Sequence, residues 1–191
     1  MKSQIKIAGS LFLSFVTASV AQQAVTVGTH DKNSTAALIL EQQEGERRLH
    51  RPAGTSTGTA PFILKYDPQN GPSKHLVMFT EKLPPGASIP KHKHPECEEI
   101  LILQTGHSRV HLGNTTRDVG AGASVLIPPN TWISVDVVGD DPVSLIAIFS
   151  EPGFEDYMRA ISVREGEAST PISKPELEAI RAHHSHAVNY D

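Results

Sequence analysis

The sequence has too few cysteines for any internal disulfide bond. Cys97 is the only cysteine among 191 residues, and a single thiol cannot pair within its own chain. Stability must therefore come from a packed core, a bound metal or partner subunits. Aromatic residues are also scarce, at 5%, whereas 14 glycines and 14 prolines are present. This composition favours many short strands and turns over a helical bundle.

The sequence also lacks a cluster of basic residues of the kind that binds nucleic acid. Its formal net charge is −4 and its hydrophobic fraction is 38%, as is typical of a globular protein. A chain of this length accommodates one domain with modest extensions. We therefore expect a small-molecule ligand or substrate and no nucleic-acid partner.

No apolar run near the N-terminus is long enough for a comfortable membrane span. Lys2 and Lys6 form a basic start, residues 7–16 are a short apolar core, and residues 17–21 are mostly small. This order is typical of a secretory signal peptide, whereas a membrane anchor needs a longer apolar run. The sequence predicts a signal peptide over residues 1–21, a secreted or periplasmic protein, and no membrane contact after cleavage.

The rest of the chain divides into three parts. Residues 22–60 are predicted to form an N-terminal arm and linker, with a short helix over Ala36–Glu41. Residues 61–150 contain short strand candidates separated by Gly/Pro turns, a pattern that favours a β-sandwich or barrel. The strands are expected at 62–66, 75–81, 88–94, 98–105, 107–112, 124–127, 132–138 and 143–150.

Residues 151–191 are predicted to form a short helical extension. One helix is expected over Phe154–Ala160. A second is expected to run from Ser173, a plausible N-cap, to about His183, because Pro175 would lie in its first turn.

Two histidines and a carboxylate lie at metal-ligand spacing in the predicted barrel. Because side chains alternate along a strand, His92 and His94 share one face and can hold one ion together. Glu99, after a short turn, can supply a third ligand. Glu98 is its rival, but neighbouring strand residues face opposite ways, so only one of the two can face the ion. Two imidazoles and one carboxylate are typical of non-haem iron and related divalent metal sites.

These residues resemble the first conserved motif of the cupin superfamily. That motif is Gly, five residues, His-x-His, three or four residues, Glu, six residues, Gly, and every spacing is present here. The second motif is partly present: Gly122 and Pro128 match it, Asn130 replaces a glycine, Ile133 replaces the histidine and Val137 replaces an asparagine. Asparagine also tolerates the positive φ of the replaced glycine. The first motif is matched by Gly86, His92, His94, Glu99 and Gly106.

The resemblance covers about residues 61–150 and implies an all-β, double-stranded β-helix (jelly-roll) barrel. It also implies a divalent transition metal, Fe, Mn, Ni, Cu or Zn, held by His92, His94 and Glu99. In the family the histidine replaced here by Ile133 is usually a fourth ligand. Two outcomes are therefore open: a metal site with three protein ligands and more open positions, or a barrel that has lost its metal and only binds ligands.

Other side chains are weaker candidates. His107 and His111 lie on the face opposite the apolar Val110 and are expected to be exposed. We interpret His75, which alternates with strand residues, as a structural histidine, with entry into the barrel as the alternative. Cys97 is interpreted as a small buried residue. Phe79 and Trp132 are interpreted as core residues, with a place in the wall of a pocket as the alternative. Three histidines near the C-terminus are expected to complement a helix dipole: His183, His184 and His186.

Two functions from different classes follow from these predictions. The first is a metal-dependent oxidoreductase of the dioxygenase type, in which Glu99 also moves a proton. The second is a non-catalytic ligand-binding, storage or scaffold cupin. The resemblance also implies a homodimer, because barrels of this family commonly pair through sheet edges and an N-terminal arm.

Overall fold

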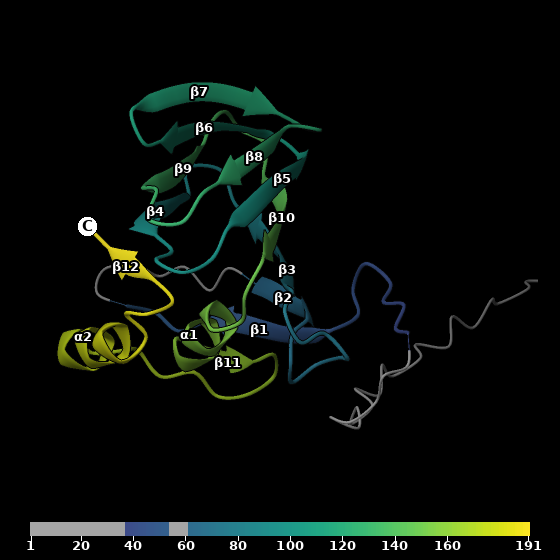
Figure 1. Cartoon of the computed structure of the whole chain (residues 1–191), viewed down its shortest axis with the longest axis vertical. Coiled ribbons are helices and arrows are strands. Elements are labelled where there is room, and N and C mark those ends of the chain that lie inside the picture. The colour runs from purple at the N-terminus through teal and green to yellow at the C-terminus, as the bar shows by residue number, and fades with distance from the viewer. Residues whose placement is uncertain (1–36, 54–60) are drawn as a thin grey trace, which may run out of the picture.

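A computed structural model describes residues 37–53 and 61–191 of the chain. The predicted signal peptide, residues 1–21, lies outside the described residues, as do parts of the predicted arm. Two antiparallel sheets form a barrel, and two short helices lie together at one end of it (Figure 1). No helix in the described part of the chain has the length and apolar character needed to cross a membrane.

The larger sheet has seven strands in the order β11-β1-β2-β3-β10-β5-β8. Its strands are β1 (Glu46–His50), β2 (Pro61–Tyr66), β3 (Val77–Leu83), β5 (Glu99–Thr105), β8 (Ser124–Ile127), β10 (Val143–Phe149) and β11 (Ser162–Arg164). The smaller sheet has five strands in the order β12-β4-β9-β6-β7. Its strands are β4 (Ser88–Lys93), β6 (His107–Leu112), β7 (Thr115–Gly120), β9 (Ile133–Val137) and β12 (Asn189–Tyr190).

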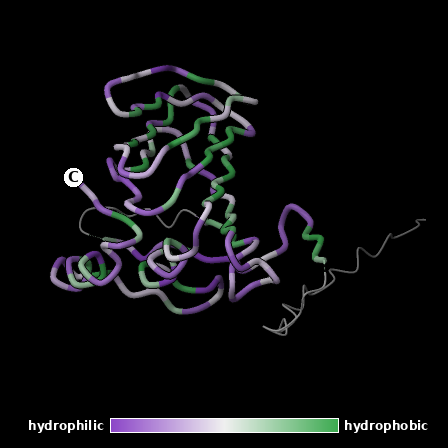
Figure 2. Tube along the Cα trace, in the orientation of Figure 1, coloured by the Kyte–Doolittle hydropathy of each residue, from purple (hydrophilic) through white to green (hydrophobic). Residues whose placement is uncertain are grey.

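The core lies between the two sheets, and in β9 and β10 it is built by strict alternation of buried residues. In β10 every second residue is buried, from Val143 to Phe149, and β9 alternates in the same way. Hydrophobic residues follow these strands in Figure 2, whereas α2 (Lys174–His183) is mostly hydrophilic and buries no residue. The all-β, double-stranded β-helix fold expected from the sequence is confirmed.

Most expected elements are present within two residues of their predicted ends. The helix α1 (Phe154–Ala160) has the predicted bounds. Ser173 is the N-cap of α2 and accepts a hydrogen bond from the backbone N–H of Glu176 at 3.3 Å. The sequence analysis missed β7, whose short Thr-rich sequence has no buried residue and so no apolar alternation. The helix expected over Ala36–Glu41 is wrong, because residues 37–41 have no helical structure.

The segments outside the predicted barrel also add strands to the sheets. β1, from the predicted arm, pairs with β2 and with β11. β12, at the end of the predicted helical extension, pairs with β4. The 151–191 segment is therefore mixed, with two helices and two strands.

The outer face of the larger sheet carries a row of apolar side chains. Met78 of β3 lies opposite Ile148 of β10, which lies opposite Ile100 of β5, which lies opposite Leu126 of β8. Ile100 and Leu126 are 38% and 56% exposed. Contiguous apolar surface of this kind is typical of contact surfaces. The homodimer implied by the sequence stays a prediction.

Tight turns connect the strands at the positions of the motif glycines. Gly86 and Gly106 both have φ of 75°, in the left-handed region that favours glycine. Asn130, at the place of a motif glycine, has φ of 60°, which confirms that asparagine serves there. Only at Gly106 is space also restricted, because an added Cβ would lie 2.7 Å from the carbonyl oxygen of Pro142.

We therefore expect Gly106→Ala to destabilise the protein far more than Gly86→Ala. Both substitutions place alanine at the same positive φ, which costs on the order of 1 kcal/mol. Gly86 has nothing within 4 Å of the added Cβ, whereas the clash at Gly106 raises the loss to about 3 kcal/mol. Urea unfolding of the two variants measures the difference, and equal losses would show that the close approach to Pro142 has no energetic weight.

A buried ionic network ties the first strand to α1. Glu46 of β1 accepts hydrogen bonds from Arg48, from Arg159 at 2.9 Å and from Asn70 at 2.9 Å. Arg159 also donates to Asp67 at 2.7 Å. Burial alone would raise the pKa of Glu46, but the hydrogen bond and charge of Arg159, with the other two donors, outweigh it and lower the pKa to about 2.

This network predicts an acid-sensitive contribution to stability. Because the pKa of Glu46 is lower in the folded protein than its ordinary value of 4.5, its contribution is complete above that value. It is lost as pH falls from there toward about 2. We expect Glu46→Gln to lower the free energy of unfolding by on the order of 3 kcal/mol at neutral pH and by much less at about pH 3. Denaturant unfolding at both pH values measures this, and a pH-independent effect of the substitution would contradict it.

Candidate metal centre

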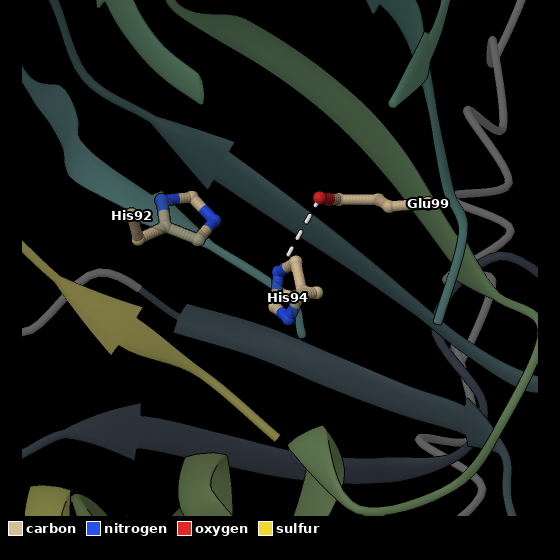
Figure 3. Close-up of side chains that lie close together, drawn as sticks. All are labelled: His92, His94 and Glu99. Carbon is tan, nitrogen blue, oxygen red and sulfur yellow. Dashed lines mark ion pairs between the residues drawn. The ribbon is translucent and has the colours of Figure 1, made fainter. Parts of the chain in front are cut away.

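The three predicted ligands lie together inside the barrel. His92 is on β4, His94 follows the end of that strand, and Glu99 begins β5 on the opposite sheet. Their ligand atoms all lie within 4.8 Å of one another, and the side chains point toward a common centre (Figure 3). The three residues are 5%, 1% and 4% exposed. Glu98 is exposed, as strand alternation predicts.

Backbone carbonyls fix the orientation of both imidazole rings. The Nδ1 of His92 lies 2.7 Å from the carbonyl oxygen of Pro90, and the Nδ1 of His94 lies 2.8 Å from that of Ala187. A carbonyl oxygen can only accept a hydrogen bond, so Nδ1 carries the proton in each ring. The Nε2 atom of each neutral ring is thereby left with a free lone pair, as a metal ligand requires.

The facing atoms of His94 and Glu99 lack a partner. His94 Nε2 and Glu99 Oε2 are 3.4 Å apart (Figure 3), and both atoms are buried without a hydrogen bond in the described part of the chain. A lone pair and a carboxylate oxygen repel each other unless a positive charge lies close to both. A proton on Nε2 or a metal ion can supply that charge, and the two-imidazole, one-carboxylate donor set suits a divalent transition metal.

Burial also sets the charge states around the centre. It lowers the pKa of His92, against the opposing charge of Glu99, and so favours the neutral ring that can bind a metal. Burial, followed by the charges of Glu99 and Glu151, raises the pKa of the Cys97 thiol to about 11. Burial thus favours the neutral thiol of Cys97, and Cys97 is not one of the three clustered candidate ligands of the described residues, which agrees with its interpretation as a small buried residue.

Ile133 occupies the position of the motif histidine, and its side chain cannot serve as a fourth metal ligand. It lies directly opposite His92 in the β4–β9 pairing and is fully buried in the apolar core. The structure brings together no other group of three potential metal ligands at this spacing within residues 37–53 and 61–191. Any site at this centre therefore has three protein side chains from the described residues.

The remaining histidines lie away from the centre. His107 and His111 are on the outer face of β6, as expected, and His111 Nε2 lies 3.2 Å from Asp136 Oδ2. The interpretation of His75 as a structural or inward histidine is wrong. β3 begins only at Val77, and the side chain of His75 is 78% exposed. At the tail, the His183 ring lies 4.8 Å from that of His184, which lies 6.2 Å from that of His186.

The two aromatic candidates differ in position. Phe79 is a core residue and also lines the cavity beside the centre, so both of its interpretations hold. Trp132 is only half-buried and lies outside the core cluster. The ammonium groups of Lys91 and Lys93 lie 5.2 and 5.1 Å from its ring centroid, a cation–π arrangement.

The C-terminal segment completes the centre, which the sequence analysis did not anticipate. Ala187 supplies the carbonyl that holds His94. In the β12–β4 pairing Tyr190 lies opposite His92, with their ring centroids 5.8 Å apart. The only local sign of a strand was the short run Val188-Asn189-Tyr190, which contains a β-branched and an aromatic residue. Such a run does not indicate which strand it pairs with.

A cavity of about 1000 Å³ opens from the centre. His92 and Glu99 are part of its wall, and most other lining residues are apolar. His50 and Glu81 also line it, with His50 Nε2 3.2 Å from Glu81 Oε1. Cavities of this size bind small organic molecules, so the centre is accessible to a substrate or ligand.

The fold and the centre define a double-stranded β-helix protein with a candidate metal site. Residues 79–149 match the family model of the cupin domain. This part of the chain is therefore similar to cupin domains, as the motifs indicated.

Individual relatives are distant. The uncharacterized protein YrkC of Bacillus subtilis is 27% identical over 85 residues, or 41% of this chain and 46% of that protein. The match thus spans about half the length of this curated relative. A predicted oxalate decarboxylase from Thermotoga maritima superposes with a TM-score of 0.53 at 18% identity, over 60% of this chain and 100% of that one. An RmlC-like cupin from Shewanella frigidimarina superposes with a TM-score of 0.44 at 17% identity, and the match covers 56% of this chain and 88% of that one.

The carbonyl contacts predict the tautomers of the two ligand histidines. In metal-free protein we expect the neutral rings of His92 and His94 to carry their proton on Nδ1, because Pro90 and Ala187 accept from that atom. Long-range ¹H–¹⁵N NMR spectra distinguish the tautomers, with the exposed His107 as a reference. A neutral ring protonated on Nε2 at either position would contradict the geometry.

Proposed function

We propose that this protein binds a divalent transition metal and acts as a metal-dependent oxidoreductase of the dioxygenase type on a small organic substrate. The observation that carries the proposal is the pair of buried, unpartnered atoms His94 Nε2 and Glu99 Oε2, which face each other at 3.4 Å. Together with His92 they offer the donor set preferred by Fe, Mn, Ni, Cu or Zn.

The three side chains have distinct tasks in this proposal. His92 and His94, held by Pro90 and Ala187, present neutral Nε2 atoms. Glu99 presents a carboxylate oxygen to the same centre and is proposed to take up or return a proton of the substrate, because it also lines the cavity. A bound ion at a site with open positions supplies Lewis-acid or redox chemistry to whatever enters beside it.

The cavity walls support an organic substrate larger than a simple dicarboxylate such as oxalate. The walls include apolar side chains, among them Phe79, Leu101 and Phe154. The Thermotoga relative is named as a predicted oxalate decarboxylase. A cavity of about 1000 Å³ with mostly apolar walls fits an organic molecule with an apolar body better than it fits oxalate.

The second candidate is a non-catalytic cupin that binds, stores or presents a ligand. Ile133 favours it, because the position from which the family usually provides its fourth ligand is apolar and buried here. The same cavity would then hold the ligand, and the buried charges of the centre would serve only to orient it. Secretion of the protein and its homodimer are further proposals that rest on the sequence.

We expect His92→Ala and Glu99→Gln each to weaken metal binding by more than about a hundredfold. Both substitutions remove one of only three side-chain donors. Glu98→Gln is the matched control, since it removes an adjacent exposed carboxylate and should leave metal affinity unchanged. Metal content by mass spectrometry and zinc titration by calorimetry measure the effect. Stoichiometric metal in both ligand variants, or none in the unsubstituted protein, would contradict the proposal.

Oxygen consumption then separates the two candidate functions. Protein loaded with a redox-active ion, in turn Fe(II), Mn(II), Ni(II) and Cu(II), is tested in an oxygen electrode with flavonols and with carboxylic acids that have an apolar body. Consumption that is abolished by His92→Ala and retained by Glu98→Gln supports the oxidoreductase. Metal binding with ligand binding but without turnover supports the non-catalytic cupin.

A further inference from the structure

The cavity contains a charged side chain that has no task in the metal centre. Arg181, in the last turn of α2, lines the same cavity as His92 and Glu99. Its guanidinium carbon lies 4.2 Å from the ring centroid of Tyr190, and that ring lies 5.8 Å from the ring of His92. Cation, aromatic ring and ligand ring thus form a continuous series from α2 to the centre.

One hydrogen-bond donor of Arg181 is buried without an acceptor in the described part of the chain. Its Nε atom is buried and has no hydrogen-bond partner, and the side chain forms no ion pair in the described part of the chain. A buried guanidinium donor without an acceptor is costly unless a ligand completes it. Its place at the C-terminal end of α2 is favourable for a cation but supplies no acceptor to Nε.

The neighbouring cavity arginine shows the contrast. Arg51 donates to the carboxylate of Glu176 at 2.8 Å and to the carbonyl of Thr170 at 2.9 Å. His50, also in the wall, is paired with Glu81. Arg181 is therefore the cavity arginine whose charge the described residues leave unmatched.

We propose that the cavity binds an organic monocarboxylic acid, with its carboxylate on Arg181 and its apolar body directed toward the metal centre. A guanidinium binds a carboxylate through two parallel hydrogen bonds, which fixes orientation as well as affinity. The stacking on Tyr190 holds the guanidinium plane in place. The apolar walls, which include Leu101, Phe154 and Leu177, accept the hydrocarbon part. The far end of the ligand would lie at His92 and Glu99, and only this part of the inference rests on the proposed function.

The test compares an acid with its uncharged isostere. Hydrocinnamate and hydrocinnamide are titrated by calorimetry into the purified protein, both zinc-loaded and EDTA-treated. We expect the acid to bind more tightly than the amide by about tenfold to a hundredfold. Arg181→Met should abolish that preference, and Arg181→Lys should retain part of it as a point charge. Arg117→Met, on the exposed face of β7, is the matched control and should bind like the unsubstituted protein.

Each outcome separates this inference from the metal proposal. Equal affinity for acid and amide, or full acid affinity in Arg181→Met, would overturn the inference even if metal content is normal. Absence of metal in the unsubstituted protein would defeat the proposed function, while the EDTA-treated titrations would still decide the role of Arg181. If Arg181→Met fails to fold, as judged by its melting temperature, the acid–amide comparison in the unsubstituted protein and Arg181→Lys decides.

Discussion

The site depends on one electrostatic constraint: a histidine nitrogen and a carboxylate oxygen face each other while both are buried. The lone pair of His94 Nε2 and the carboxylate oxygen of Glu99 cannot both remain unpaired there at low energetic cost. The constraint is imposed from outside the pair, because the carbonyl of Ala187 accepts from Nδ1 of the same ring. The other nitrogen of the ring, Nε2, therefore faces the centre with its lone pair. A proton on Nε2 or a metal ion between the two atoms resolves the conflict, and in the proposed metal centre His92 adds a third donor.

This arrangement connects parts of the chain that are far apart in sequence. The β4–β5 turn brings the histidines and the glutamate from two sheets to one point. The C-terminal strand then pairs with β4, where the backbone N–H of Asp191 donates to the carbonyl of Lys91 at 3.2 Å and the Lys91 side chain pairs with Asp191 at 2.7 Å. Because this segment both orients His94 and carries the aromatic ring beside His92, the candidate metal centre and the cavity beside it share one wall.

Local sequence patterns predicted the barrel and its three candidate ligands. The elements that the sequence analysis missed or misplaced depend on pairing between distant segments, which local patterns do not reveal. Alternation placed Glu98 outside and Glu99 inside, and the glycine spacing predicted the turns, including Asn130 at positive φ. β7 has no apolar alternation to detect, and the short β12 is defined by its partner strand. His75 was misplaced because the start of β3 depends on its pairing with β10, in which Val77 lies opposite Phe149. Arg181 drew no attention in the sequence, since an arginine near a helix C-terminus is ordinary until the cavity and its missing acceptor are known.

X-ray absorption spectroscopy of the zinc-loaded protein tests the central claim most directly. The account predicts two imidazole nitrogens and one carboxylate oxygen as the protein ligands, with no sulfur, at distances near 2.0–2.2 Å. Loss of one imidazole in His94→Ala would assign the ligand whose Nε2 faces Glu99. A spectrum with a sulfur ligand, or with only oxygen ligands as for a solvated ion, would contradict the account.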